Sequence, residues 1–277
     1  MSDKVLDAIN QGKYDEGIRY STSVIEKAIA IDDKYFEFVG YDSQSTLYSN
    51  LDDTINARIN SQKALEIARE TKADTLISWD YLNLGTIYSD NKKHYEKGIR
   101  YLKKSLELFE KLNQVDDIIL IYLNIAWTYL DHNRNEEAYS YLTRIKKLEN
   151  KHPLQELDQV YLQFLFGKYY LNMKNYEAAE QELKTAAITI DRDSIIDLGP
   201  ENYELLAKTY SKKKDYENAF LALEKYNIYN KKVYARDKLK EIEKASAKFN
   251  LKEYQKDLKS AIEAKQLSDE LFEKTND

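Results

Sequence analysis

Cysteine is absent from this 277-residue chain, and proline and glycine are scarce, with 2 and 7 residues. Without cysteine the chain has no disulfide, no thiolate nucleophile and no cysteine-ligated zinc. A domain of this length built from β-strands or long loops would use far more turn residues than this. Charged residues make up 32% of the chain, and the remainder is rich in residues that favour helix. The composition therefore predicts an all-α fold.

Basic surface and long apolar runs are also missing. The net charge of −6 lacks the positive footprint that phosphate contacts require, so direct nucleic-acid binding is not expected. No apolar run approaches the roughly 18 residues that span a bilayer, and the start MSDKVLDAINQGK has no apolar signal core. We therefore expect a soluble segment without membrane insertion, and the sequence leaves open whether it is cytoplasmic or periplasmic.

A repeated turn sequence is present instead. Its six copies end at residues separated by 40, 41, 40, 41 and 40 positions. The copies are GKYDEG at 12–17, DDTINA at 52–57, KHYEKG at 93–98, NRNEEA at 133–138, KNYEAA at 174–179 and KDYENA at 214–219. Such a fixed period predicts a repeat architecture with two helices per unit.

A second small residue precedes each complete turn and is followed three positions later by tyrosine. The pairs are Ser45 and Tyr48, Gly85 and Tyr88, Ala126 and Tyr129, Gly167 and Tyr170, and Ala207 and Tyr210. Each repeat thus has one small residue in each of its two helices. We interpret these as the positions where neighbouring helices cross closely.

This pattern resembles an array of tetratricopeptide repeats over roughly residues 3–230. In one unit the resemblance rests on Tyr81, Leu84, Gly85, Tyr88, Gly98 and Leu102. It implies a right-handed superhelical solenoid of about six hairpins, whose helices are longer than those of the usual unit of about 34 residues. The second unit departs from the pattern at Gln44 and Ser61. The expected repeats span 1–30, 31–72, 73–113, 114–152, 153–192 and 193–232.

The two ends of the array differ from its middle. Only 3–10 is present of the first leading helix, which suggests either a fragment of a longer protein or a short capping helix. Residues 233–277 should be helical in one or two pieces, either capping the last repeat or running on to an output domain. The tail also resembles the extension in tetratricopeptide sensor regulators of Bacteroidetes-type bacteria, where a histidine kinase or an AraC/LuxR-type DNA-binding domain follows. A homodimer through this tail is a further expectation.

Catalytic patterns are missing from the sequence. His94, His132 and His152 occupy turns or linkers, and no two histidines have the spacing of a helical metal site. No glycine-rich phosphate loop follows a strand pattern. We therefore expect neither an enzyme nor a cofactor or metal site.

In tetratricopeptide proteins the first helix of each hairpin lines a concave groove, so the resemblance implies where a ligand would bind. The residues expected there are Trp79, Leu82, Asn83, Thr86, Leu123, Asn124, Trp127, Tyr161, Phe164, Lys168 and Lys208. Asn83 and Asn124 share one repeat position. Their carboxamides would either grip the backbone of an extended peptide, with Trp127 and Phe164 taking its apolar side chains, or bond neighbouring helices. The lysines would receive a carboxylate or remain solvated.

Two functions are compatible with these features. The first is a non-catalytic sensor or interaction module that binds a peptide or protein segment in its groove, as part of a larger signalling or transcriptional regulator. The second is a structural scaffold that docks a folded partner, or associates with itself, through its convex face or its tail.

Overall fold

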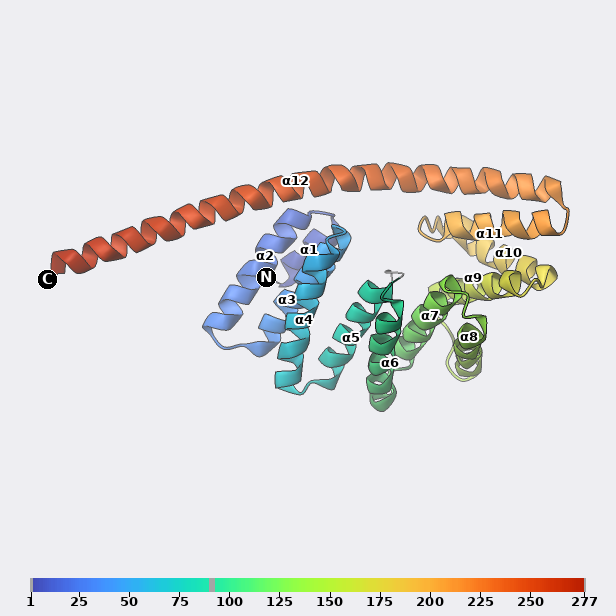
Figure 1. The fold of residues 1–277 in the computed structure, drawn as a ribbon, viewed down its shortest axis with the longest axis horizontal. Coiled ribbons are helices and arrows are strands. Elements are labelled where there is room, and N and C mark those ends of the chain that lie inside the picture. Colours follow the sequence, from blue (N-terminus) through green and yellow to red (C-terminus); the bar gives the residue numbers. More distant parts are fainter. Residues whose placement is uncertain (1, 90–92, 277) are drawn as a thin grey trace. The chain divides into compact units, whose positions relative to one another are not determined.

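The computed structural model describes the backbone of residues 2–89 and 93–276, and the side chains of residues 3–89, 93–252 and 256. Twelve helices and no strand are present in this part of the chain (Figure 1). The helices are α1 Ser2–Asn10, α2 Tyr14–Ala30, α3 Lys34–Asn50, α4 Thr54–Thr71, α5 Asp74–Ser89, α6 Tyr95–Leu112, α7 Val115–Asp131, α8 Asn135–Glu149, α9 Glu156–Asn172, α10 Tyr176–Asp193, α11 Gly199–Lys212 and α12 Tyr216–Asn276. The all-α prediction is confirmed, and each expected repeat contains one pair of helices.

The repeated turns join the two helices of each pair. Their first residue ends the preceding helix in the left-handed conformation, which stops helix propagation. This holds for Gly12, Asp52, Asn133, Lys174 and Lys214. The second turn residue then starts the next helix. At Asp53, Asn175 and Asp215 its side chain accepts a hydrogen bond from a backbone N–H of the first helical turn, which stabilises the helix N-terminus.

The small residues lie where the helices of a pair cross. A methyl group on Gly85 would meet the Leu102 side chain at 2.7 Å, and one on Gly167 would meet Leu183 at 2.5 Å. Both contacts join the first helix of a hairpin to the second. A methyl group on Gly98 would meet backbone, with Ser89 N at 2.6 Å and the Gly85 carbonyl oxygen at 2.7 Å. The interpretation of the small residues as crossing points is confirmed for these three glycines.

The chain divides into two compact units. One comprises residues 65–237, and the other combines residues 1–64 with 238–277. The first boundary lies inside α4 and the second inside α12, so neither coincides with a turn. The boundary that we expected at residue 232 also lies inside α12, which runs without a break, and that domain division stays a prediction.

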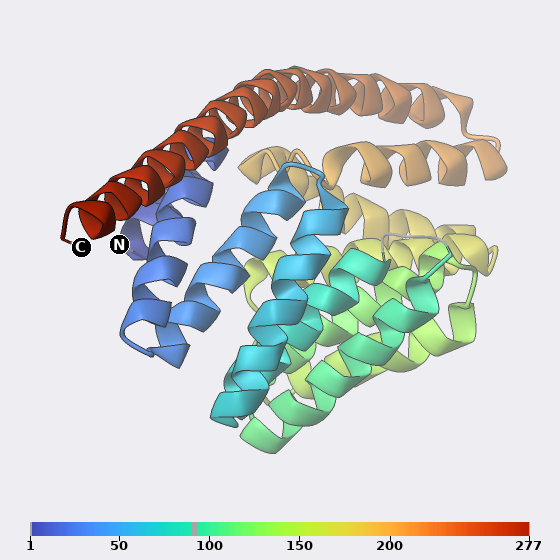
Figure 2. The same cartoon turned by 60° about the vertical axis from the view of Figure 1, so that its left-hand side comes forward.

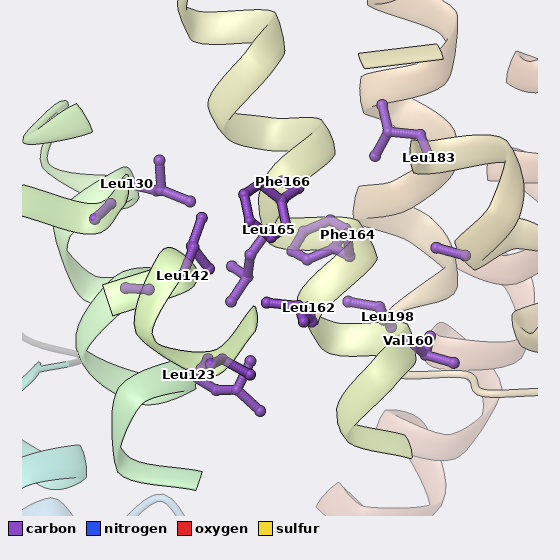
Figure 3. Packing of buried hydrophobic residues seen from close by; sticks show 14 of the residues in the cluster. Leu123, Leu130, Leu142, Val160, Leu162, Phe164, Leu165, Phe166, Leu183 and Leu198 are labelled. Carbon is purple, nitrogen blue, oxygen red and sulfur yellow. The ribbon is translucent and has the colours of Figure 1, made fainter. Parts of the chain in front are cut away.

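The unit of residues 65–237 contains the main hydrophobic core. The hairpin α5–α6 lies side by side in both views (Figures 1 and 2). Toward the middle of the core, Leu162, Phe164 and Leu165 of α9 have at most 1% of their surface exposed (Figure 3). The start of α12 belongs to this unit as the second helix of the sixth repeat. Its Tyr229 hydroxyl donates to the Ile190 carbonyl oxygen at 2.9 Å.

The other unit joins the first hairpins to a later part of α12. Ala247 is buried in a cluster with Val5, Tyr14 and Leu47. The Lys244 ammonium group donates to the Asp52 carboxylate and, at 3.1 Å, to Glu241. The expectation that the first half of the tail caps the last repeat stays a prediction. Ala247 and Leu251 of α12 pack on buried side chains of α1, α2 and α3.

None of the helices in the described residues is long and apolar enough to cross a membrane.

Candidate functional site

Two neighbouring pockets open on the side of the hairpins that carries α5, α7 and α9. The polar pocket has a volume of about 520 Å³ and lies between α5 and α7. Its lining residues are Thr86, Ser89, Asn124, Trp127, Thr128, Asp131 and His132. The apolar pocket has a volume of about 360 Å³ and lies between α7 and α9. Its lining residues are Leu120, Leu123, Asn124, Trp127, Leu157, Asp158 and Tyr161.

Trp127 and Asn124 form the wall that both pockets share. The Trp127 ring is held by aromatic neighbours on α9, with centroid distances of 5.0 Å to Phe164 and 6.0 Å to Tyr161. The Lys168 ammonium group lies 5.6 Å from the centre of the same ring. Because the ring is supported from one side and half exposed on the other, it can contact a ligand in either pocket without reorganising.

The helical repeat explains which predicted groove residues reach the pockets. Leu82, Leu123 and Phe164 occupy one repeat position, and at most 5% of each side chain is exposed. This position points into the core, so the expectation that Leu82 and Phe164 contact a ligand is wrong for the described structure. Phe164 supports Trp127 from beneath, and Leu123 contributes only to the wall of the apolar pocket.

Two other repeat positions face the pockets. Thr86 and Trp127 share one of them, and Tyr161 shares the other with Leu120 and Trp79. Positions that are seven residues apart lie on the same side of a helix, as Leu120 and Trp127 do. Trp79 is 38% exposed and packs edge-on against Phe109, and it lines neither pocket.

The two asparagines differ from each other. Asn124 reaches both pockets, and its Nδ2 donates to the Leu120 carbonyl oxygen of its own helix at 2.8 Å. This amide hydrogen is therefore used within α7 and is not available to a neighbouring helix or to a ligand. Asn83 is half-buried and lines neither pocket. The expected pair of equivalent carboxamides would require Asn83 to line a pocket beside Asn124. Of the two asparagines, only Asn124 lines the polar pocket.

Lys168 is neither a free anion receptor nor a solvated surface lysine. Its ammonium group lies 2.5 Å from Asp131 Oδ1 and 2.5 Å from Glu201 Oε1, and 12% of its side chain is exposed. Burial opposes the charge, but the two carboxylates outweigh it and raise the pKa of the Lys168 ammonium group. The bridge ties α7, α9 and α11 together beside Trp127. Lys208 is engaged locally, 2.7 Å from Glu204.

The lining of the apolar pocket includes one carboxylate. Asp158 lines it, and burial together with the nearby Asp116 carboxylate raises the pKa of the Asp158 side chain. Burial and Asp116 likewise raise the pKa of Asp117 in the first turn of α7. In both groups burial contributes most to the raised pKa, and the Asp116 carboxylate adds to it because it disfavours a second negative charge nearby.

Four residues of the polar pocket were not anticipated from the sequence, namely Ser89, Thr128, Asp131 and His132, and neither were Leu157 and Asp158 of the apolar pocket. For Thr128 and His132 a signal was present in the sequence of α7, whose middle is apolar apart from a few positions. Asn124, Thr128 and His132 follow one another at intervals of four residues, which places them in one row along the helix. His132 was assigned to a turn, and its ring folds back to the helix through a 2.8 Å hydrogen bond from Nδ1 to the Thr128 carbonyl oxygen.

Within residues 2–89 and 93–276, no group of three or more histidine, aspartate or glutamate side chains is placed to hold a metal ion.

Comparison with known proteins identifies the class of fold. A family model for the tetratricopeptide repeat matches residues 81–112, 119–152, 160–193 and 200–226. Residues 81–226 therefore contain tetratricopeptide repeats, which have a protein-interaction fold. A comparison with curated proteins found no match.

Solved structures with the same fold include two Rap proteins and a signal transduction ATPase. The apo form of RapI is 14% identical with a TM-score of 0.67, and the alignment covers 84% of this chain and 82% of RapI. A Rap protein complexed with competence and sporulation factor is 13% identical with a TM-score of 0.61, covering 83% of this chain and 63% of that one. A signal transduction ATPase with a tetratricopeptide repeat sensor from Pyrococcus horikoshii is 20% identical with a TM-score of 0.65, covering 87% of this chain and 38% of that protein. At these identities the likeness shows the fold alone.

Proposed function

We propose that this chain is a non-catalytic module that binds a peptide or an extended protein segment across α5, α7 and α9. The observation that carries this proposal is the pair of adjacent pockets that share Trp127 and Asn124. One pocket is polar and the other is lined largely by leucine and tyrosine. A ligand with a polar side chain next to an apolar one would fill both, which a small compact metabolite would not.

The structural relatives support a role in signalling. One Rap structure is a complex with competence and sporulation factor, and the Pyrococcus protein carries a tetratricopeptide repeat as a sensor. By analogy, this chain would be the sensor part of a larger signalling or transcriptional regulator. Transmission would require two arrangements of the helices that the ligand binds with different affinity. The Lys168 bridge between α7, α9 and α11 is the contact beside Trp127 that such a change would alter.

The proposal is tested by selecting ligands from a displayed random-peptide library on the intact chain and measuring the affinity of a selected synthetic peptide. We expect Trp127→Ala to weaken binding by about 2 kcal/mol or more, the usual loss for a central aromatic contact. Trp79→Ala is the matched control, because Trp79 lies on α5 outside both pockets, and it should bind normally. Equal affinity for wild type and Trp127→Ala, or loss only with Trp79→Ala, would refute the site.

A second function is favoured by one observation on α12. Leu239, Ile242 and Phe249 are each at least 60% exposed, and their spacing places them in one row along the helix. Such a row would allow self-association through the tail, as a scaffold requires. Sedimentation of the chain at rising concentration tests this function, and a constant monomer mass would argue against it.

A further inference from the structure

The two threonine hydroxyl protons of the polar pocket are already used in hydrogen bonds within the helices that carry them. Thr86 Oγ1 donates to the Asn83 carbonyl oxygen at 2.9 Å, and Thr128 Oγ1 donates to the Asn124 carbonyl oxygen at 2.8 Å. A threonine hydroxyl has one hydrogen and two lone pairs. Both hydroxyls can therefore only accept a hydrogen bond from a ligand.

The side chains of Asn124 and His132 also present hydrogen-bond acceptors to the pocket. Asn124 Nδ2 donates to a carbonyl oxygen of its own helix, which leaves Oδ1 as an acceptor. His132 Nδ1 lies 2.8 Å from the Thr128 carbonyl oxygen and must carry the proton, because a carbonyl oxygen cannot donate. In the neutral imidazole, Nε2 is then an acceptor. This atom is buried and has no hydrogen-bond partner among the described residues.

The charge at the edge of the pocket is negative. Asp131 lines the pocket and uses Oδ1 to bind Lys168. The same ammonium group is shared with Glu201, so two carboxylates face one positive charge. Oδ2 of Asp131 has no hydrogen bond within the described part of the chain and can accept one.

We propose that the polar pocket binds a guanidinium group, the side chain of an arginine in the peptide ligand. This inference rests on the proposed function and names the chemistry of one ligand residue. The donors left in the pocket are the Trp127 indole, the Ser89 hydroxyl and one amide hydrogen of Asn124, and acceptors outnumber them. A guanidinium offers five donors in one plane and also stacks on an aromatic face, here that of Trp127. The volume of about 520 Å³ is sufficient for that side chain.

The test follows the indole N–H signals of the intact chain by NMR spectroscopy. The chain contains only 2 tryptophans, Trp79 and Trp127, so two such signals are expected. The Trp79→Phe variant assigns them. The probes are N-acetyl-arginine methylamide, its neutral citrulline counterpart, which has the same shape, and the norleucine counterpart. We expect saturable shifts of the Trp127 signal with the arginine probe, and binding weaker by about tenfold with citrulline because charged hydrogen bonds are the stronger ones.

Substitutions of single carboxylates test which negative charge binds the arginine probe. Asp131→Asn keeps the shape of the side chain and should weaken the arginine probe by about tenfold. The control Glu204→Gln removes an exposed carboxylate on α11 that lines neither pocket, and it should leave the affinity unchanged. Equal affinity for arginine and citrulline probes, or equal losses in the two variants, would overturn the proposal.

The outcome also separates this inference from the proposed function. If selected peptides bind at Trp127 but contain no arginine, and the arginine probe leaves the Trp127 signal unshifted, the peptide site stands and the guanidinium proposal falls. If the arginine probe binds as expected and no peptide is selected, the pocket takes a small guanidinium compound and the peptide function falls.

Discussion

Trp127 is the residue on which the proposed site depends. It lines both pockets, and its ring is fixed by Phe164, Tyr161 and Lys168. A side chain that is already ordered loses little further entropy when a ligand binds. The equivalent residue of the preceding repeat is Thr86, which is too small to form such a wall. The site is thus specific to the α7 repeat, and it does not recur along the array.

Gly98 provides a test of the packing at single-residue scale. In Gly98→Ala, the new methyl group would lie 2.6 Å from the Ser89 nitrogen and 2.7 Å from the Gly85 carbonyl oxygen, both backbone atoms. Because backbone cannot move aside without separating α5 from α6, we expect a loss of about 1–3 kcal/mol in the free energy of unfolding. Denaturant unfolding followed by circular dichroism measures this loss.

The control for that substitution is Arg100→Ala, an exposed position in the same helix. It should change the free energy of unfolding by less than about 0.5 kcal/mol. Alanine has a helix propensity about 1 kcal/mol better than glycine. A Gly98→Ala variant that is as stable as wild type, or more stable, would therefore mean that α5 and α6 are not in close contact at this position.

At the scale of the element, α7 carries both core residues and pocket residues. Ile119, Ile121 and Ile125 are fully buried in the core. Asn124 and Thr128 point to the pockets and satisfy part of their hydrogen-bonding capacity within the helix. Ile121 and Thr128 are seven residues apart and so lie on the same side of the helix, and Thr128 is only 6% exposed, so a substitution at Thr128 affects the core as well as the pocket.

The packing of α12 on the first hairpins can be tested by changing one small residue. Ala247 is 2% exposed and buried against Val5 and Tyr14. In Ala247→Asp, a carboxylate without a partner would enter this cluster, at a cost of about 3 kcal/mol or more. We expect the segment to detach locally, and trypsin to cut after Lys244 and Lys248 much faster than in wild type.

Ala245→Asp is the matched control, since it makes the same change at an exposed position of the same helix. Its cleavage rate should equal that of wild type. If both variants were cut at the same rate, the burial of Ala247 would play no part in holding the segment.

At the scale of the whole molecule, the 40–41-residue period was sufficient to predict the helices, the turns and the close crossings. Each of these depends on local sequence, such as Asp53 at a helix start or Gly98 at a crossing. The second repeat was recognised as the weakest, and one unit boundary lies in its α4, which buries the polar Asn60 and Ser61.

The pockets could not be predicted in full, for two physical reasons. A rotation of one residue along a helix, about 100°, decides whether a side chain such as Leu123 or Trp127 faces the core or the surface. The position of Asp131 and His132 depends on contacts with Lys168 and with the Thr128 carbonyl oxygen, which the sequence does not specify. The packing of residues 244–251 on α1, α2 and α3 also joins segments too far apart in the chain for the repeat pattern to predict.

The central claim is that ligand binds at the α5, α7 and α9 face. Hydrogen exchange of the intact chain, with and without a selected peptide, tests it most directly, because bound ligand suppresses local opening. We predict slower exchange in residues 74–89, 115–131 and 156–172, and no change in residues 2–50. Protection confined to residues 2–50 or 238–276, with none in α7, would contradict the account.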